Sequence, residues 1–264
     1  MRYVRPVDFK VFPEKQFHSH VIANWDNGVE SCMVILTRVP PGTATGANGV
    51  TLGSHTHDVD QFYCVLSGRM TVELGKTLHR AVPGAIVQIP AGLPHWNWNE
   101  GEEDEIHLEI LAPSPMTYDF ARAYRADRDR PARVTEGAVR SVEFAGRATG
   151  STPLLRSLAD QSTGSKDIAI KLIDLPRASP NNAAEDEFLS ISGADNFYFV
   201  SEGVLGVQIG LERHEVGPYS LVVLPSGVAH RIWNADKKTG TRVYHLRTPL
   251  PAPAVRGDAS VRFA

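Results

Sequence analysis

The chain has 264 residues, of which 42% are hydrophobic and 22% are charged, and its formal net charge is −3. This is the composition of an ordinary folded protein, which excludes a largely disordered chain. Lysine and arginine are scattered along the sequence, so no basic face is available for nucleic acid, and no apolar run is long enough to span a bilayer.

The first residues, MRYVRPVDFKVFPEK, are interrupted by charge and proline. They lack the continuous apolar core of a secretory signal, so we expect a cytoplasmic protein. Cys32 and Cys64 each lie within an apolar segment that contains β-branched neighbours. Two such cysteines are expected to be small buried thiols in a reducing compartment and not a disulfide framework.

Short apolar runs separated by glycine and proline follow along the chain. This pattern predicts many short strands joined by turns, and therefore an all-β fold. The clearest runs of the first half are CMVILTRV (32–39), QFYCVLSG (61–68), MTVEL (70–74) and GAIVQIP (84–90).

Four donor side chains lie among these strands. His55 and His57 are two residues apart, so both imidazoles leave the same face of a strand, and Gln61 shares that parity. His95 follows the turn-rich run IPAGLP, which would end one strand and start the next. Imidazoles with one neutral oxygen donor suit a first-row transition metal better than magnesium or calcium. An isolated His-x-His pair is more often two exposed histidines, so this pattern alone leaves the site open.

Strand parity extends the face of these donors to Tyr63 and Asn97, which are candidates for the same cavity. The alternative for Tyr63 is a core aromatic residue whose hydroxyl bonds to the backbone. His107, in the later run HLEIL, is a candidate proton acceptor or a half-exposed strand histidine, since alternation does not tell which face points inward. Trp96 and Trp98 have the opposite parity and are expected to pack outside, against the other domain or against a second subunit in a homodimer.

The second half of the chain repeats the first. QFYCVLSG resembles NFYFVSEG (196–203), and IPAGLPHWNWN resembles LPSGVAHRIWN. Position 61 corresponds to 196 and position 95 to 230, a constant offset of 135, which makes a tandem duplication the simplest interpretation. The charged segment 113–137 between the copies is interpreted as a solvated linker. We therefore expect two domains, 1–135 and 136–264.

The second copy lacks most of the donors. Ser190, Ser192 and Asn196 occupy the positions of the first two histidines and the glutamine, and His230 is the one imidazole that is kept. One imidazole with weak donors does not hold a transition metal, so one metal per chain is expected. A structural role is favoured for this domain, and a small ligand in its interior is the alternative.

These residues resemble the two motifs of the cupin superfamily. The first motif is glycine, five residues, His-x-His, three or four residues, an acid, six residues and glycine, and it is filled by Gly49, His55, His57, Gln61 and Gly68. The second motif is filled completely by Gly84, Pro90, Gly92, His95 and Asn99. The resemblance implies a bicupin with two double-stranded β-helix (jelly-roll) barrels, and His55, His57, Gln61 and His95 as metal ligands.

Gln61 is the departure from the family pattern, because most cupins have glutamate there. A neutral amide leaves the full +2 charge on a bound ion, which makes the ion a stronger Lewis acid and a less easily oxidised centre. It also removes a candidate base. Glutamine does occur at this position in some cupins, so Gln61 is kept as a predicted ligand.

Three functions fit the resemblance. A non-haem dioxygenase would bind Fe(II), O₂ and a small enolisable or aromatic molecule. A redox-neutral lyase, isomerase or cyclase would use Mn, Zn or Ni as a Lewis acid while a nearby base moves a proton. A sensor or ligand-binding module would have no turnover. Family frequency favours the iron dioxygenase, whereas Gln61 and the lack of an obvious base favour Lewis-acid chemistry.

Overall fold

The computed structural model describes residues 3–47, 50–51, 53–115, 124–125, 137–141, 152–177, 188–236, 238–250 and 259–262. These residues form β-strands joined by turns, which confirms the all-β class, with short 3-10 helices at Phe9–Val11, Trp25–Asn27 and Gln161–Thr163. Within this described part, no helix has the length and apolar character needed to cross a membrane.

The chain divides into two compact units. One unit comprises residues 8–143, and the other comprises residues 1–7 together with 144–264. We call them the N-terminal barrel and the C-terminal barrel. Their boundaries differ from the expected division at residue 135. Most of the expected linker, 113–137, lies outside the described residues.

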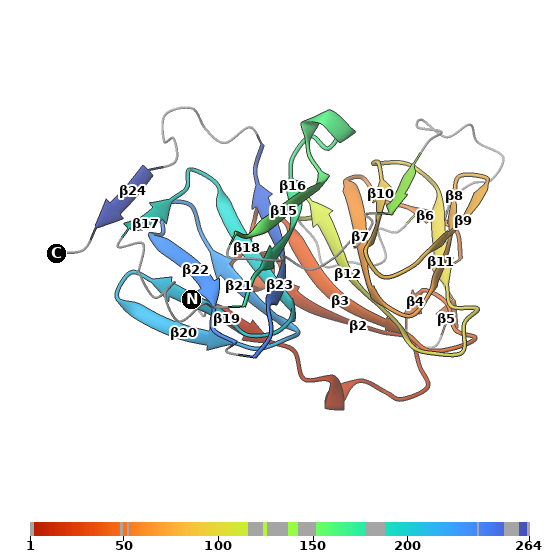
Figure 1. Cartoon of the computed structure of the whole chain (residues 1–264). Helices are drawn as coiled ribbons and strands as arrows, with labels where there is room; N and C mark the ends of the chain where they lie inside the picture. Colours follow the sequence, from red (N-terminus) through yellow and green to blue (C-terminus); the bar gives the residue numbers. More distant parts are fainter. Residues whose placement is uncertain are drawn as a thin grey trace. The chain divides into compact units, whose positions relative to one another are not determined.

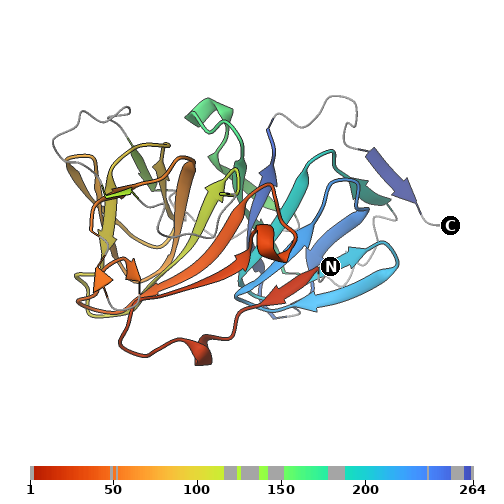
Figure 2. The same ribbon diagram turned by 180° about the vertical axis from the view of Figure 1, so that it is seen from behind.

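Two short strands account for this difference. β14 (Ala138–Ser141) pairs with β10 (Ala85–Ile89) and so belongs to the N-terminal barrel. β1 (Val4–Pro6) pairs with β21 (Ser220–Leu224) and belongs to the C-terminal barrel, where it lies beside the blue strands in Figure 2. The two strands occupy equivalent places, each at the edge of one sheet.

The N-terminal barrel consists of two antiparallel sheets (Figure 1), with strand orders β14-β10-β7-β12-β3-β2 and β13-β6-β11-β8-β9, and a small β4-β5 ribbon. Its further strands are β2 (His18–Ala23), β3 (Met33–Val39), β4 (Gly46–Ala47), β5 (Val50–Thr51), β6 (His55–Thr56), β7 (Asp60–Ser67), β8 (Met70–Leu74), β9 (Thr77–Ala81), β11 (His95–Trp98), β12 (Glu105–Ala112) and β13 (Tyr124–Arg125).

The C-terminal barrel repeats this arrangement, with strand orders β1-β21-β18-β23-β16-β15 and β20-β19-β22-β17-β24. Its further strands are β15 (Leu154–Ala159), β16 (Ala169–Leu175), β17 (Phe188–Ile191), β18 (Asp195–Glu202), β19 (Leu205–Ile209), β20 (Glu212–Val216), β22 (His230–Asn234), β23 (Thr241–Thr248) and β24 (Ala259–Arg262).

Residues at equivalent positions in the two halves of the chain pair in the same way in both barrels. His95 pairs across β11 and β6 with His55, and His230 pairs across β22 and β17 with Ser190. These are the pairs that the offset of 135 residues relates, so the expected equivalence of the two barrels around His95 and His230 is confirmed.

Alternation along β7 explains both the core and the site. Tyr63 and Val65 belong to the apolar core of the N-terminal barrel, on the strand face that also carries Gln61. Phe62 and Cys64 point to the opposite face and are also fully buried. Cys64 and Cys32 are buried thiols, as expected, and they form no disulfide with each other.

Gly68 ends β7 in a conformation that requires glycine. Its φ is +70°, and a Cβ there would collide with the backbone of Asp104 and Glu105. Gly203, its equivalent, has a φ of +77° and meets the backbone of Gly240 and Thr241 in the same way. The close approach of two backbones therefore explains the glycine of the first motif.

Candidate metal centre

Three histidines of the N-terminal barrel lie close together. His55 and His95 face each other on paired strands, and His57 follows β6. Their ring centroids are 4.3 Å (His55 to His95), 5.0 Å (His55 to His57) and 5.2 Å (His57 to His95) apart. Each offers a ring nitrogen within 4.8 Å of the others, a spacing that could hold one metal ion. Among the described residues, this is the one cluster of histidine, cysteine or acidic side chains with that property.

Backbone carbonyls orient two of these rings. The Nδ1 atoms of His55 and His95 donate to the carbonyl oxygens of Gly53 and Leu93, each at 2.9 Å. This places the lone pair of each ring on Nε2, the state that a metal ligand needs. The Nε2 of His95 is buried and has no hydrogen-bond partner in the described part of the chain.

All three imidazoles are held neutral. Burial lowers the pKa of His57 to about 3, with a further contribution from the neighbouring His55. Burial also lowers the pKa of His55 and of His95. Neutral imidazole is the form that binds a metal, so the burial of the cluster favours binding over protonation.

Gln61 supplies a neutral oxygen on β7. Its Nε2 donates to Glu109 Oε1 at 2.5 Å, and Thr37 donates to Glu109 Oε2 at 3.4 Å. The Oε1 of Gln61 is buried and, among the described residues, has no hydrogen-bond partner. An unpaired buried acceptor is costly unless a cation or donor meets it. The orphaned atoms of Gln61 and His95 therefore fit a divalent metal with imidazole and oxygen ligands.

His107 faces the same side of the barrel wall as Gln61, which alternation alone could not decide. On β12 it pairs with Val65, and Glu109 pairs with Tyr63. Its Nδ1 lies 2.9 Å from Glu105 Oε2, and its ring centroid is 4.7 Å from that of Tyr63. All of these side chains are buried, so His107 is not the half-exposed histidine of the alternative interpretation.

Two acidic side chains, those of Glu105 and Glu109, lie close to His107 in the buried interior. Burial opposes protonation of His107, but Glu105 and Glu109 together raise its pKa. Burial raises the pKa of Glu109, against the opposite influence of His107 and Gln61. Sequence reasoning missed Glu105, although the alternation of Glu105, His107 and Glu109 was available as a signal that all three share one face.

Asn97 is buried but is engaged with Thr45. The Thr45 hydroxyl donates to the side-chain oxygen of Asn97, and the Thr45 amide donates to its backbone carbonyl at 3.0 Å. Asn97 thus forms hydrogen bonds with Thr45. That it also contributes to the cavity stays a prediction. Trp96 and Trp98 pack against each other with ring centroids 4.6 Å apart.

The equivalent positions of the C-terminal barrel form a different network. The Tyr198 hydroxyl donates to His230 Nε2 at 3.3 Å, and His245 Nε2 donates to Asn196 Oδ1 at 2.9 Å. Here the amide oxygen and the imidazole acceptor are both used internally. Such an arrangement leaves little for a metal.

Residues 35–111 match the family model described as Cupin domain. No curated protein has a sequence significantly similar to this chain. A salicylate 1,2-dioxygenase from Pseudaminobacter salicylatoxidans superposes with a TM-score of 0.69 at 11% identity, over 96% of this chain and 82% of that one. An oxalate decarboxylase variant from Bacillus subtilis gives 0.64 at 12% identity, over 97% and 79%. A cupin 2 conserved barrel domain protein from Leptotrichia buccalis gives 0.60 at 10% identity, over 94% and 98%.

Identities this low demonstrate a shared fold. The superpositions extend over most of the chain, beyond the part that the family model matches. The expected pair of jelly-roll barrels is therefore confirmed.

Proposed function

Because residues 35–111 match the cupin domain and the whole chain has a two-barrel fold shared with cupin structures, we propose that it is a metal-dependent enzyme of the non-haem dioxygenase class. The metal would be held by His55, His57, His95 and Gln61. Iron is the metal that we propose, with manganese, nickel or zinc as alternatives. The substrate would be a small enolisable or aromatic molecule that reacts with O₂.

One observation carries the proposal. Three neutral imidazoles, those of His55 and His95 buried and that of His57 half-buried, present ring nitrogens within 4.8 Å of one another. The buried acceptors of His95 and Gln61 have no partner among the described residues. When bound, a divalent ion supplies Lewis acidity and, in the case of iron, the capacity to activate O₂. Similarity in fold to a salicylate dioxygenase adds support to this class.

The protein's own side chains would prepare the site. Glu109 accepts a hydrogen bond from the Gln61 amide, which leaves the amide oxygen as the atom available to a cation. The apolar core around Tyr63 lies on the strand face that carries Gln61 and would limit the access of water there. His107 and Glu105 form a buried pair that can hold a proton on His107 Nδ1.

This buried pair favours a second candidate function. A redox-neutral lyase, isomerase or cyclase needs a base, and the sequence offered none that was obvious. His107, with its pKa raised by Glu105 and Glu109 against the effect of burial, is a candidate for that role. The similarity in fold to an oxalate decarboxylase is compatible with a reaction other than that of a dioxygenase.

Metal content and O₂ consumption separate the two candidates. The protein is purified anaerobically, its metals are determined by elemental analysis, and O₂ uptake is followed with a panel of hydroxybenzoates, catechols and 1,3-diketones. Iron together with substrate-dependent O₂ uptake that His55→Ala abolishes is the result expected for the dioxygenase. Manganese or zinc, with product formed and no O₂ consumed, would replace it by the redox-neutral function.

A further inference from the structure

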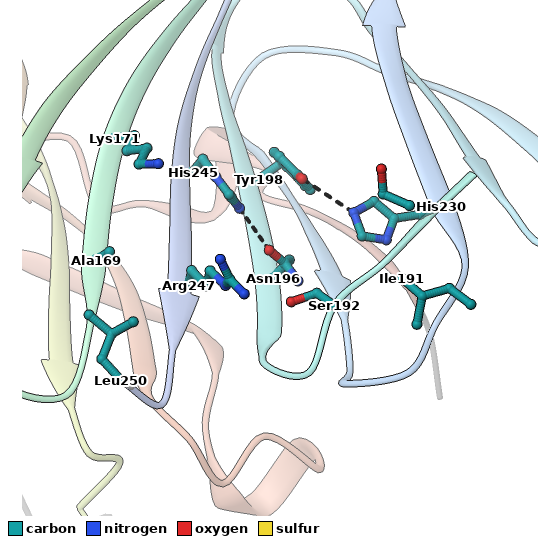
Figure 3. A pocket seen from close by; sticks show the side chains of 11 residues that line it. Ala169, Lys171, Ile191, Ser192, Asn196, Tyr198, His230, His245, Arg247 and Leu250 are labelled. Atoms are coloured by element: carbon teal, nitrogen blue, oxygen red, sulfur yellow. Dashed lines mark hydrogen bonds between the residues drawn. The ribbon is translucent and has the colours of Figure 1, made fainter. Parts of the chain in front are cut away.

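A cavity of about 450 Å³ opens in the C-terminal barrel (Figure 3). The four positions equivalent to the predicted metal ligands all line it, namely Ser190, Ser192, Asn196 and His230. Its lining also includes two cationic side chains, Lys171 and Arg247, whereas none of the described lining side chains is acidic. The place of the metal site is thus a cavity whose described lining carries two cations and no acid.

The strand register accounts for this convergence. β16, β23 and β18 are neighbours in one sheet, and Lys171, His245 and Tyr198 form one row across them. Arg247 pairs with Asn196 in the adjacent row. Because positions two apart share a face, all five side chains leave the same side of the sheet, as Figure 3 shows.

The cations are specific to the C-terminal barrel. In the N-terminal barrel the same strand positions carry two buried aliphatic side chains and the acid that holds Gln61. Two apolar residues are therefore replaced by cations, and one acid is replaced by an imidazole. The equivalent positions are Ile35 and Lys171, Leu111 and Arg247, and Glu109 and His245.

The cavity contains a cation, Lys171, that is not paired with an acid of the described residues. Burial, followed by the charges of Lys171, His230 and Arg247, lowers the pKa of His245 to about 3, so this imidazole is neutral. Lys171 forms no ion pair with any described residue, and it is half-buried. A partly buried cation is stabilised when an anion pairs with it.

We propose that the C-terminal barrel binds a small organic anion with one or two carboxylate groups, with Lys171 and Arg247 as its charge partners. The guanidinium fork of Arg247 matches a carboxylate in geometry. Ala169, Ile191 and Leu250 line other parts of the cavity and suit the carbon skeleton of such a molecule. A volume of this size falls in the range of small-molecule sites.

Calorimetric titration of the full chain tests the proposal, with succinate, benzoate and inorganic phosphate as probes and succinamide as the uncharged analogue. Succinate or benzoate should bind, and succinamide should not. Lys171→Ile and Arg247→Leu, which introduce the residues of the N-terminal barrel, should each weaken binding about 10- to 100-fold. Arg213→Leu, on the exposed part of β20, removes the same charge elsewhere and should leave binding unchanged.

Thermal unfolding of each variant reports whether the barrel is intact, and Lys171→Met, which keeps most of the side-chain stem, serves if Lys171→Ile does not fold. Equal binding of succinamide, or unchanged carboxylate binding in folded Lys171 and Arg247 variants, would overturn the proposal. Binding of phosphate without either carboxylate would overturn the ligand class. The His55→Ala chain should still bind the carboxylate, and loss of binding there would place the anion at the metal centre instead.

Discussion

At the scale of single residues, the two barrels differ in how one side-chain amide is hydrogen-bonded, that of Gln61 in the first and that of Asn196 in the second. Gln61 donates its amide hydrogen to Glu109, so its oxygen is left for a cation. Asn196, at the equivalent position, accepts from His245 through its oxygen. The partner of the amide, an acid in one barrel and an imidazole in the other, thus decides whether the amide oxygen is left unpaired or is used as an acceptor within the barrel.

A charge swap tests this role of Glu109. Gln61→Glu alone would set two carboxyl groups against each other at hydrogen-bond distance, so one must keep a proton and little metal affinity is gained. The double variant Gln61→Glu with Glu109→Gln keeps the hydrogen bond and places the charge toward the metal. We expect it to bind metal about 10-fold more tightly than the single variant, measured by competition with a chelator.

Glu109→Gln alone is the matched control for the swap. It replaces a carboxylate, which can only accept, by an amide that can donate to the Gln61 oxygen as well as accept from its nitrogen. Gln61 is then no longer held in one orientation, so metal affinity should fall about 10-fold or more below that of the unmodified protein. His55→Ala should empty the site, because it removes an imidazole. If Glu109→Gln leaves the affinity unchanged, Glu109 does not orient Gln61.

At the scale of elements, the tight turn after β7 brings Gly68 so close to the backbone of Asp104 and Glu105 that no side chain fits there. Gly68→Ala should lower the free energy of unfolding by about 1–3 kcal/mol, because it adds a clash to a strained positive φ. Gly42→Ala is the control, since Gly42 also has a positive φ (+72°), but a Cβ added there would meet no described atom within 4 Å. Urea unfolding measures both, and equal losses would show that the clash is relieved.

The pairing of β1 predicts a second effect at this scale. The Val223 amide donates to the Tyr3 carbonyl at 2.8 Å, and the Val7 amide donates to the Tyr219 carbonyl at 3.0 Å. Removal of residues 1–7 should therefore accelerate amide hydrogen exchange in β21, because its edge loses these partners. Strand β10, which pairs with β14, is the internal control and should exchange as before. Unchanged exchange in β21 would contradict the strand assignment.

At the scale of the whole molecule, the duplicated barrels are expected to divide their tasks. We expect one equivalent of metal per chain by elemental analysis, because the C-terminal barrel has one imidazole at the equivalent ligand positions and uses it internally. His230→Ala should leave that stoichiometry unchanged, whereas His55→Ala should reduce it toward zero. Two equivalents of metal, one of them lost in His230→Ala, would contradict this division.

The sequence by itself determined the class of fold and the duplication, and its resemblance to the cupin motifs predicted the approach of three histidines. Alternation with a period of two and turn residues define strands locally, and a constant offset between repeats does not depend on tertiary contacts. The spacing of His55 and His57 places both on one strand face, and the equivalent motif in the second half lacks them.

Only the tertiary structure decided which groups oppose one another across strands. Alternation defines two faces of β12 but cannot say which one faces Gln61, so Glu105 was missed and His107 stayed ambiguous. Lys171 and Arg247 lie 76 positions apart in the sequence, and the register of β16 and β23 brings both to the lining of one cavity. β1 and β14 likewise take their places by pairing with strands distant in the chain. Such contacts depend on long-range register, which local sequence patterns do not encode.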